Sequence, residues 1–256
     1  MTTLDKFKLT GRVAIVTGGG QGIGKAIASA FTEAGARVLV SDMIDKTVQS
    51  TEQELRSQGR EVLATVTDVR NSGQVADMFR TAMDHFGRVD ILVNNAAGNF
   101  KAPFLELSEN GWDAVVRAAL KSVFLCSNAA AKIMVEQKSG NIINISSMDA
   151  YRSSISAVPY GASKAAVISL TRTLALELSP HNIRVNSLAP GYIDTPGTAQ
   201  WRTPEIEEQR KKIIPLGRMG RPEEMATIAL FLASDASGYI TGETILADGG
   251  VLLPHP

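Results

Sequence analysis

The chain has few of the residues that mark secreted, metal-dependent or nucleic-acid-binding proteins. A single cysteine, Cys126, excludes an internal disulfide and fits a reducing compartment. The three histidines are far apart, and no cysteine or carboxylate motif accompanies them, so we expect no metal site. Lysine plus arginine and aspartate plus glutamate both total 26, so the formal net charge is zero. The charge balance therefore gives no indication of a surface that binds nucleic acid or an anionic membrane.

Long hydrophobic runs are also missing. No apolar stretch reaches membrane-spanning length, and residues 1–10 lack the apolar core of a signal peptide. There is no repeat, low-complexity segment or linker. With 256 residues, 44% of them hydrophobic, the chain can build one large core. We therefore expect a single cytoplasmic domain, residues 1–256.

What the chain does contain is a regular alternation of strand-like and helix-like segments. Strand-like runs at 13–16, 37–41, 61–66, 89–93, 141–145, 183–188 and 244–247 alternate with helical patterns at 25–33, 46–57, 72–86, 109–135, 159–179 and 222–233. This predicts an α/β fold, a doubly wound parallel sheet with helices on both faces. Residues 192–212 have no clear period, and we expect a mobile substrate lid or an insertion over the site.

A glycine-rich turn, residues 17–24, joins the first strand to the first helix. Its glycines would let backbone amides approach a phosphate at the helix N-terminus, although a tight turn that binds nothing has the same composition. Asp42 ends the second strand about twenty residues later, where a carboxylate can bind an adenosine ribose and repel a 2′-phosphate. Met43 follows in place of a phosphate-binding arginine. The pattern favours NAD over NADP, unless Asp42 is a solvated turn residue or a helix cap.

Tyr160 and Lys164 lie four residues apart at the start of a predicted helix, and therefore on one face of it. A phenol with a pKa of about 10 is a poor acid or base at neutral pH. An ammonium group one turn away favours the phenolate and lowers that pKa, so the pair is a candidate for proton transfer. Residues 94–98 and 146–147 close two further strands, at the edge where open α/β sheets bind ligands or simply turn.

Together these motifs resemble the short-chain dehydrogenase/reductase family over essentially the whole chain. The resemblance is carried by Thr17-Gly18-x-x-x-Gly22-x-Gly24, Asp68-Val69, Asn94-Asn95-Ala96, Ser147, Tyr160-x-x-x-Lys164, Pro190-Gly191 and Thr195. It implies a Rossmann-like sheet of about seven parallel strands and an NAD-dependent oxidoreductase that interconverts a secondary alcohol and its ketone. It also implies a homotetramer or a dimer.

The resemblance further implies residue roles. Ser147, or less favourably Ser146, would hold the substrate oxygen beside Tyr160, whose hydroxyl would exchange the proton. Lys164 would bind the nicotinamide ribose and lower the pKa of Tyr160. The implied cofactor-binding residues are Gly18, Gln21, Gly22, Ile23, Gly24, Asp42, Asp68, Val69, Asn94, Ala96, Tyr160, Lys164, Pro190, Gly191, Ile193 and Thr195.

One position departs from the family pattern. Ala119 stands where many members have an asparagine whose main-chain carbonyl binds a water in the proton relay. Alanine keeps the carbonyl and loses the side chain, so we expect a weakened or altered relay. The same departure motivates an alternative, a non-catalytic or impaired NAD-binding partner subunit of a hetero-oligomeric dehydrogenase.

Residues 97–104, 148–158 and 192–212 are expected to form the substrate pocket. Their apolar side chains favour a moderately apolar substrate: a hydroxyacyl thioester, a cyclic or steroid-like alcohol, or a polyol. Arg152 and Arg202 either meet a carboxylate or coenzyme A phosphate, or lie exposed at the rim.

Overall fold

The computed structural model describes residues 2–199 and 203–253. Seven parallel strands form one sheet in the order β3-β2-β1-β4-β5-β6-β7. Their bounds are β1 Val13–Thr17, β2 Arg37–Asp42, β3 Val62–Val66, β4 Ile91–Asn94, β5 Gly140–Ile145, β6 Ile183–Pro190 and β7 Thr244–Ala247. The predicted α/β fold, a parallel sheet of about seven strands, is confirmed.

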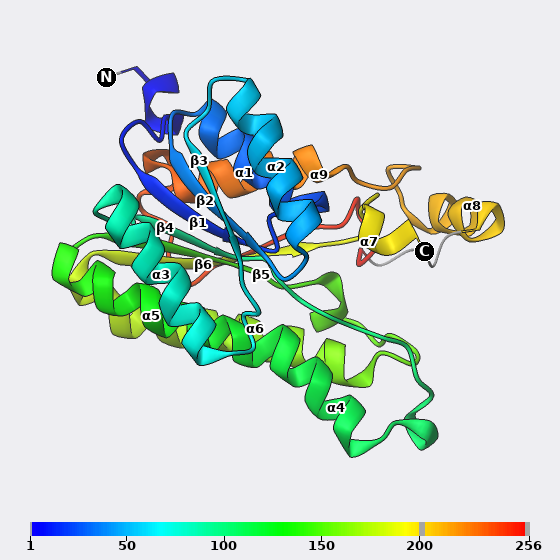
Figure 1. Cartoon of the computed structure of the whole chain (residues 1–256). Coiled ribbons are helices and arrows are strands. Elements are labelled where there is room, and N and C mark those ends of the chain that lie inside the picture. The colour runs from blue at the N-terminus through cyan, green and yellow to red at the C-terminus, as the bar shows by residue number, and fades with distance from the viewer. Residues whose placement is uncertain (1, 200–202, 254–256) are drawn as a thin grey trace.

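Helices cover both faces of the sheet (Figure 1). One face carries α1 (Gly22–Glu33), α2 (Asp45–Ser57) and α9 (Pro222–Ala233), and the other carries α3 (Ser72–Phe86), α5 (Ser122–Gln137) and α6 (Val158–Leu178). The chain winds outwards from β1 to β3 and then from β4 to β7. The strand order therefore reverses between β1 and β4, where this class of sheet forms its ligand crevice.

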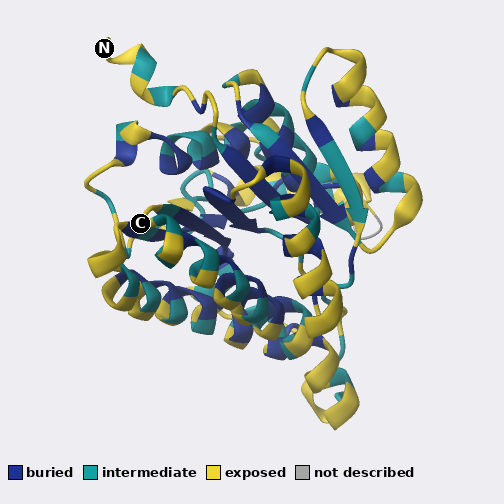
Figure 2. Cartoon of the chain, turned by 60° about the vertical axis from the view of Figure 1, so that its left-hand side comes forward, coloured by how far each residue is buried: buried dark blue, intermediate teal, exposed yellow. Residues whose placement is uncertain are grey.

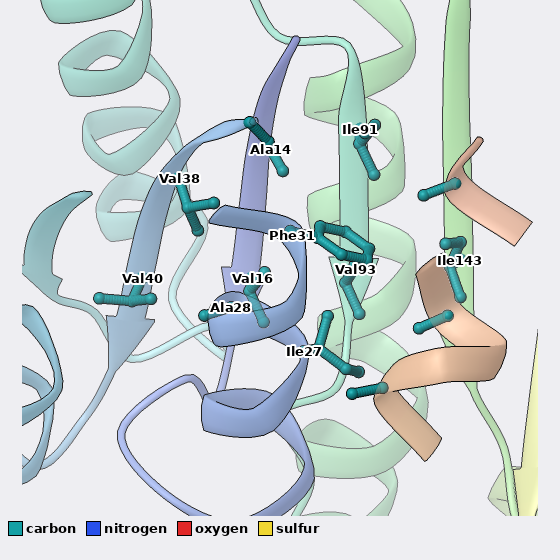
Figure 3. Close-up of a cluster of buried hydrophobic side chains, with 14 of the residues drawn as sticks. Ala14, Val16, Ile27, Ala28, Phe31, Val38, Val40, Ile91, Val93 and Ile143 are labelled. Atoms are coloured by element: carbon teal, nitrogen blue, oxygen red, sulfur yellow. The ribbon is translucent and has the colours of Figure 1, made fainter. Parts of the chain in front are cut away.

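The strands are apolar on both faces because helices cover both faces. All five residues of β1 are buried, and Figure 2 shows the central strands dark blue between helices whose outer sides are exposed, whereas the edge strands β3 and β7 are mostly of intermediate burial. In Figure 3, Ile27 and Phe31 of α1 pack on Val16 and its strand neighbours. Fully burying a side chain such as Phe31 stabilises the fold by about 1.5–3 kcal/mol, so this packing fixes where the turn before α1 stands.

The long helical stretch predicted at 109–135, for which the sequence allows a break, is divided in the structure. It consists of α4 (Glu109–Val116), a π-helical turn (Arg117–Lys121) and α5. By length and composition alone, the segment Glu109–Gln137 could cross a membrane, contrary to the sequence expectation. Its residues Val123, Cys126 and Met134 are buried, with Cys126 and Met134 in the core against the sheet, so the sheet accounts for this apolar side.

The region without a clear period, residues 192–212, is more helical than we expected. It contains α7 (Pro196–Ala199) and most of α8 (Pro204–Ile213), and α8 projects from the sheet at the right of Figure 1. α8 escaped detection because it buries no residue and so has no apolar stripe. Its start does have a local signal: Thr203 Oγ accepts a hydrogen bond from the Ile206 amide, and Pro204 follows. Trp201 and Arg202 lie outside the described residues.

Short 3₁₀ turns complete the described chain. They span Leu4–Phe7, Phe104–Glu106, Met148–Ala150, Ser179–His181 and Asp235–Ser237. The turn at Met148–Ala150 matters most for the site, because it directly follows Ser147 and directs the next residues over the end of β5.

Candidate active site

The glycine-rich turn after β1 needs its glycines. Gly18 and Gly22 have φ angles of +64° and +55°, in the left-handed region that favours glycine. A Cβ on Gly24 would lie 2.2 Å from the carbonyl oxygen of Gly18, so only glycine lets α1 approach the turn this closely. Gln21 caps α1 without a side-chain hydrogen bond, which leaves the first helical amides available to an anion.

A cavity of about 390 Å³ opens in front of this turn. Nine of the predicted cofactor residues line it: Gly18, Gln21, Gly22, Ile23, Asp42, Asp68, Val69, Ala96 and Thr195. It is also lined by residues that were not among the predicted cofactor-binding residues: Met43, Ile44, Thr67, Arg70, Asn95, Ala97, Gly98, Ala118 and Gly197. Most of these flank a predicted residue in the chain, and that adjacency is the signal that could have found them. The glycine cradle, the free helix amides and the carboxylate of Asp42 fit a dinucleotide.

Two aspartates of the cavity have different surroundings. Asp42 accepts hydrogen bonds from the amides of Gly20 and Ile44, both at 3.2 Å, and forms no ion pair with a described residue. Asp68 is paired with Arg70, whose Nη2 lies 2.8 Å from Oδ2, and this hydrogen bond holds the pKa of Asp68 below its usual value. Asp42 is therefore the carboxylate without a neutralising cation.

Asn94, expected in the cofactor groove, does not line the cavity. It is buried, and its Nδ2 donates to Asn144 Oδ1 at 2.8 Å and to Ser127 Oγ at 2.9 Å. The next residue lies at the cavity instead: Asn95 Nδ2 donates to the carbonyls of Thr17 and Gly18, both at 3.0 Å. Asn94 is the last residue of β4 and Asn95 follows it, so the motif carries one structural asparagine and one at the groove.

Several other predicted cofactor residues also lie outside this cavity. Gly24 packs beneath the turn, and Ile193 belongs to the hydrophobic core. Pro190 ends β6, and the amide of Gly191 donates to the carbonyl of Ala247 at 2.9 Å. Pro190 and Gly191 thus build the end of β6, whereas Tyr160 and Lys164 belong to a separate group of side chains.

That group gathers where β5 ends against α6. Ser147 follows β5 and shares a hydrogen bond with Tyr160. Lys164 is buried: its Nζ lies 5.5 Å from the centroid of the Tyr160 ring and donates to the Ile145 carbonyl at 2.7 Å. Ser146 Oγ donates to the Lys164 carbonyl at 2.8 Å. Ser147, rather than Ser146, is therefore the hydroxyl beside Tyr160.

The protein itself shifts both titrating groups of this site. Burial, with a contribution from the Asp149 carboxylate, raises the pKa of Tyr160 to about 12, although the hydrogen bond with Ser147 opposes the shift. Burial also lowers the pKa of Lys164 to about 8. The Nζ of Lys164 is directed at a backbone carbonyl, and Lys164 is not among the causes of the Tyr160 shift. That Lys164 lowers the pKa of Tyr160 stays a prediction for the enzyme with its cofactor bound.

Ala119 lies within the π-helical turn and is fully buried. In this wider turn the Ser122 amide donates a hydrogen bond to the Arg117 carbonyl. Ala118, which belongs to the same turn, lines the cavity. An asparagine at position 119 would have to bury an amide group there. Its introduction would therefore disturb folding as well as any relay.

The expected substrate regions adjoin one another. The Ala102 amide donates to the Ser156 carbonyl at 3.0 Å, which joins 97–104 to 148–158. Arg152 Nη2 donates to the Tyr192 hydroxyl at 2.9 Å, which joins 148–158 to the lid. Phe100, Tyr151 and Ile155 are exposed, so the loops present apolar surface outwards.

Comparison with known proteins agrees with this architecture. The family model for enoyl-(acyl carrier protein) reductase matches residues 18–252. A probable 2,4-dienoyl-CoA reductase of Bacillus subtilis is 40% identical over 250 residues, covering 96% of this chain and 98% of its own. A 3-oxoacyl-[acyl-carrier-protein] reductase of Thermotoga maritima is 39% identical over 248 residues, 96% of this chain and all of its own.

Solved structures agree with the sequence relatives. The crystal structure of a short-chain type dehydrogenase/reductase from Mycobacterium marinum has a TM-score of 0.95 and 38% identity, over 99% of this chain and 100% of that one. The chain belongs to the short-chain dehydrogenase/reductase family. It is thus an oxidoreductase of a family that acts on CH–OH groups with a nicotinamide cofactor.

Proposed function

We propose that this dehydrogenase interconverts a secondary alcohol and its ketone with NAD, using Ser147, Tyr160 and Lys164. The observation that carries the proposal is the hydrogen-bonded pair of hydroxyls on Ser147 and Tyr160, beside the buried Nζ of Lys164. Two adjacent hydroxyls can hold one substrate oxygen. The buried ammonium favours the negative charge that the phenol acquires when it gives up its proton.

Ser147 and Tyr160 have different roles in this proposal. Ser147 orients the substrate oxygen, and Tyr160 takes the alcohol proton during oxidation or returns it during reduction. The nicotinamide, when bound, accepts or supplies the hydride. Lys164, together with the positive charge of an oxidised nicotinamide, would favour the Tyr160 phenolate against the desolvation that raises its pKa.

The preference for NAD rests on Asp42. Its carboxylate lines the cavity without a cationic partner among the described residues, and Met43 and Ile44 follow it there. A ribose hydroxyl can donate to this carboxylate, whereas a 2′-phosphate would be repelled. Arg70 lines the same cavity, but its charge is neutralised by Asp68.

A moderately apolar substrate fits the loops around the site. Exposed apolar side chains gather in them, and the two curated relatives described above are named for thioesters of coenzyme A or acyl carrier protein. A hydroxyacyl thioester is therefore our preferred substrate, with cyclic or steroid-like alcohols and polyols as further members of a test panel.

The proposal includes a cytoplasmic homotetramer, with a dimer as the smaller assembly. Phe124 of α5 and Leu176 of α6 are exposed, although both belong to long helices of the domain. A second copy of the chain would bury such side chains. Light scattering at micromolar concentration tests this, and a single monomeric species would contradict it.

The test is a panel of these alcohols and their ketones, assayed with NAD and NADP in parallel. Tyr160→Phe should lower kcat at least about a hundredfold, because general acid–base catalysis contributes on the order of 10²–10⁴-fold. Tyr239→Phe is the matched control, since Tyr239 is fully exposed and distant in sequence from the site. Turnover that survives Tyr160→Phe would disprove the assigned role.

Ala119 favours the second candidate, a non-catalytic or impaired NAD-binding subunit. It predicts calorimetric binding of NAD without turnover of any member of the panel. Formation of NADH from any secondary alcohol, lost in Tyr160→Phe, would exclude it.

A further inference from the structure

A cluster of charged side chains surrounds the ring of Tyr192, at the base of the lid. The guanidinium carbon of Arg152 lies 5.0 Å from the ring centroid, and that of Arg210 lies 4.9 Å from it. Arg152 comes from the loop before α6 and Arg210 from α8. Two cations from separate segments therefore converge on one aromatic ring.

The cluster is connected to the reacting end of the site. Arg152 Nε donates to Asp149 Oδ1 at 3.0 Å, and the Asp149 amide donates to Ser147 Oγ at 3.1 Å. One residue, Asp149, thus links the cluster to the serine beside Tyr160. The cluster therefore lies within reach of a substrate whose hydroxyl is held by Ser147.

The charges of the cluster do not balance. Asp149 partners Arg152, but Arg210 has no hydrogen bond or ion pair with any side chain in residues 2–199 and 203–253. The lid holds four acids of its own. Glu208 pairs with Lys211, Glu205 hydrogen-bonds with Thr203, and Asp194 and Glu207 each have a further interaction. Contact with an aromatic face stabilises one cation, while a second cation at the same ring adds repulsion. A bound anion would remove that repulsion.

We propose that Arg152 and Arg210, together with the hydroxyl of Tyr192, form an anion-binding subsite for a carboxylate or phosphate group of the substrate. Guanidinium groups bind both anions through paired N–H donors, and a phenol hydroxyl can add a third. Arg152 and Arg210 are partly buried, so this contact would be less screened by salt than one on the open surface. The subsite rests on the proposed function because it binds the same substrate.

The experiment compares anionic alcohols with neutral ones of the same shape. 3-Hydroxybutyrate is paired with 3-hydroxybutyramide, which tests a carboxylate on the substrate itself. 3-Hydroxybutyryl-CoA is paired with its N-acetylcysteamine thioester, which lacks the coenzyme A phosphates. We expect the wild-type enzyme to have a lower KM for one anionic member than for its neutral partner.

Arg210→Gln should then raise the KM for that anionic member about tenfold, because one charge-assisted contact is lost. The kcat for the anionic member, and both KM and kcat for the neutral alcohol, should not change. Arg210→Lys should restore part of the affinity. Lys212→Gln, on the same helix, is the matched control and should change nothing. Equal KM values for both members of both pairs, or an effect of Lys212→Gln as large as that of Arg210→Gln, would overturn the subsite.

A binding measurement separates this proposal from the proposed function. Calorimetry measures the affinity of coenzyme A and of 3-hydroxybutyrate for the wild type and for Arg210→Gln. Saturating NAD is present throughout, so that the cofactor cavity is blocked. Binding that weakens in Arg210→Gln supports the subsite even where no alcohol is turned over. No binding of either anion to the wild type refutes the subsite, whatever the turnover assays give.

Discussion

The cofactor end and the substrate end of this active site are built in different ways. At the cofactor end, backbone conformation positions the binding groups: Gly18 and Gly22 turn the chain, and Asp42 lies at the end of β2. At the substrate end, side chains from separate loops meet around Tyr192. One end is fixed by the sheet, and the other depends on the position of the lid.

This difference explains why the two ends respond to different substitutions. A strand end in a buried sheet has little freedom, so changes there alter either folding or cofactor affinity. A cluster of long side chains on loops can rearrange, so changes there alter substrate affinity and proton transfer more than stability. Three substitutions test this contrast in addition to those at Tyr160 and Arg210.

The largest effect on stability is expected for Asn94→Ala, at the junction of the two ends. It removes two buried hydrogen bonds and leaves Asn144 Oδ1 and Ser127 Oγ with one partner fewer. We expect the free energy of unfolding in urea to fall by about 2–3 kcal/mol, while the KM for NAD changes less than about twofold.

Asn95→Ala is the matched control for that substitution. Asn95 lines the cavity, so this variant should instead raise the KM for NAD. If Asn94→Ala raised the KM and left stability unchanged, the two asparagines would have the reverse of the roles assigned here.

The sequence allowed the fold to be predicted closely, because each strand is a short apolar run and β1 to β5 are each followed by a helical pattern. α3 was predicted at its observed bounds, 72–86, since a periodic apolar stripe defines it. α8 was missed because a helix that buries nothing has no such stripe. The sequence allowed a break in the stretch 109–135, but it did not indicate a π-helical turn at Arg117–Lys121.

The residues of the site also fall into those that the sequence predicted and those that it did not. Gly18, Gly22 and Asp42 could be found because turn geometry and the strand end leave a signature in the sequence. Arg210 could not, because only folding brings it to Tyr192. The raised pKa of Tyr160 was also missed, because the spacing to Lys164 says nothing about desolvation.

A smaller effect, on cofactor choice, is expected for Asp42→Asn. The amide keeps the shape of the side chain and removes the charge that would repel a 2′-phosphate. The ratio of kcat/KM with NAD to that with NADP should fall about tenfold or more. Asp45→Asn, at the exposed start of α2, is the matched control and should leave the ratio unchanged. An unchanged ratio in Asp42→Asn would mean that Asp42 does not select the cofactor.

The smallest effect is expected for Asp149→Asn, which changes the substrate end without removing a reacting group. The Asp149 carboxylate disfavours the Tyr160 phenolate and so helps to raise its pKa. Its neutralisation should lower that pKa, and the acid limb of the pH profile for alcohol oxidation should move to lower pH by less than about one unit. Asp113→Asn, on the exposed side of α4, should leave the limb in place. A limb that moved to higher pH would show that Asp149 acts mainly by positioning Ser147, since loss of its negative charge can only favour the phenolate.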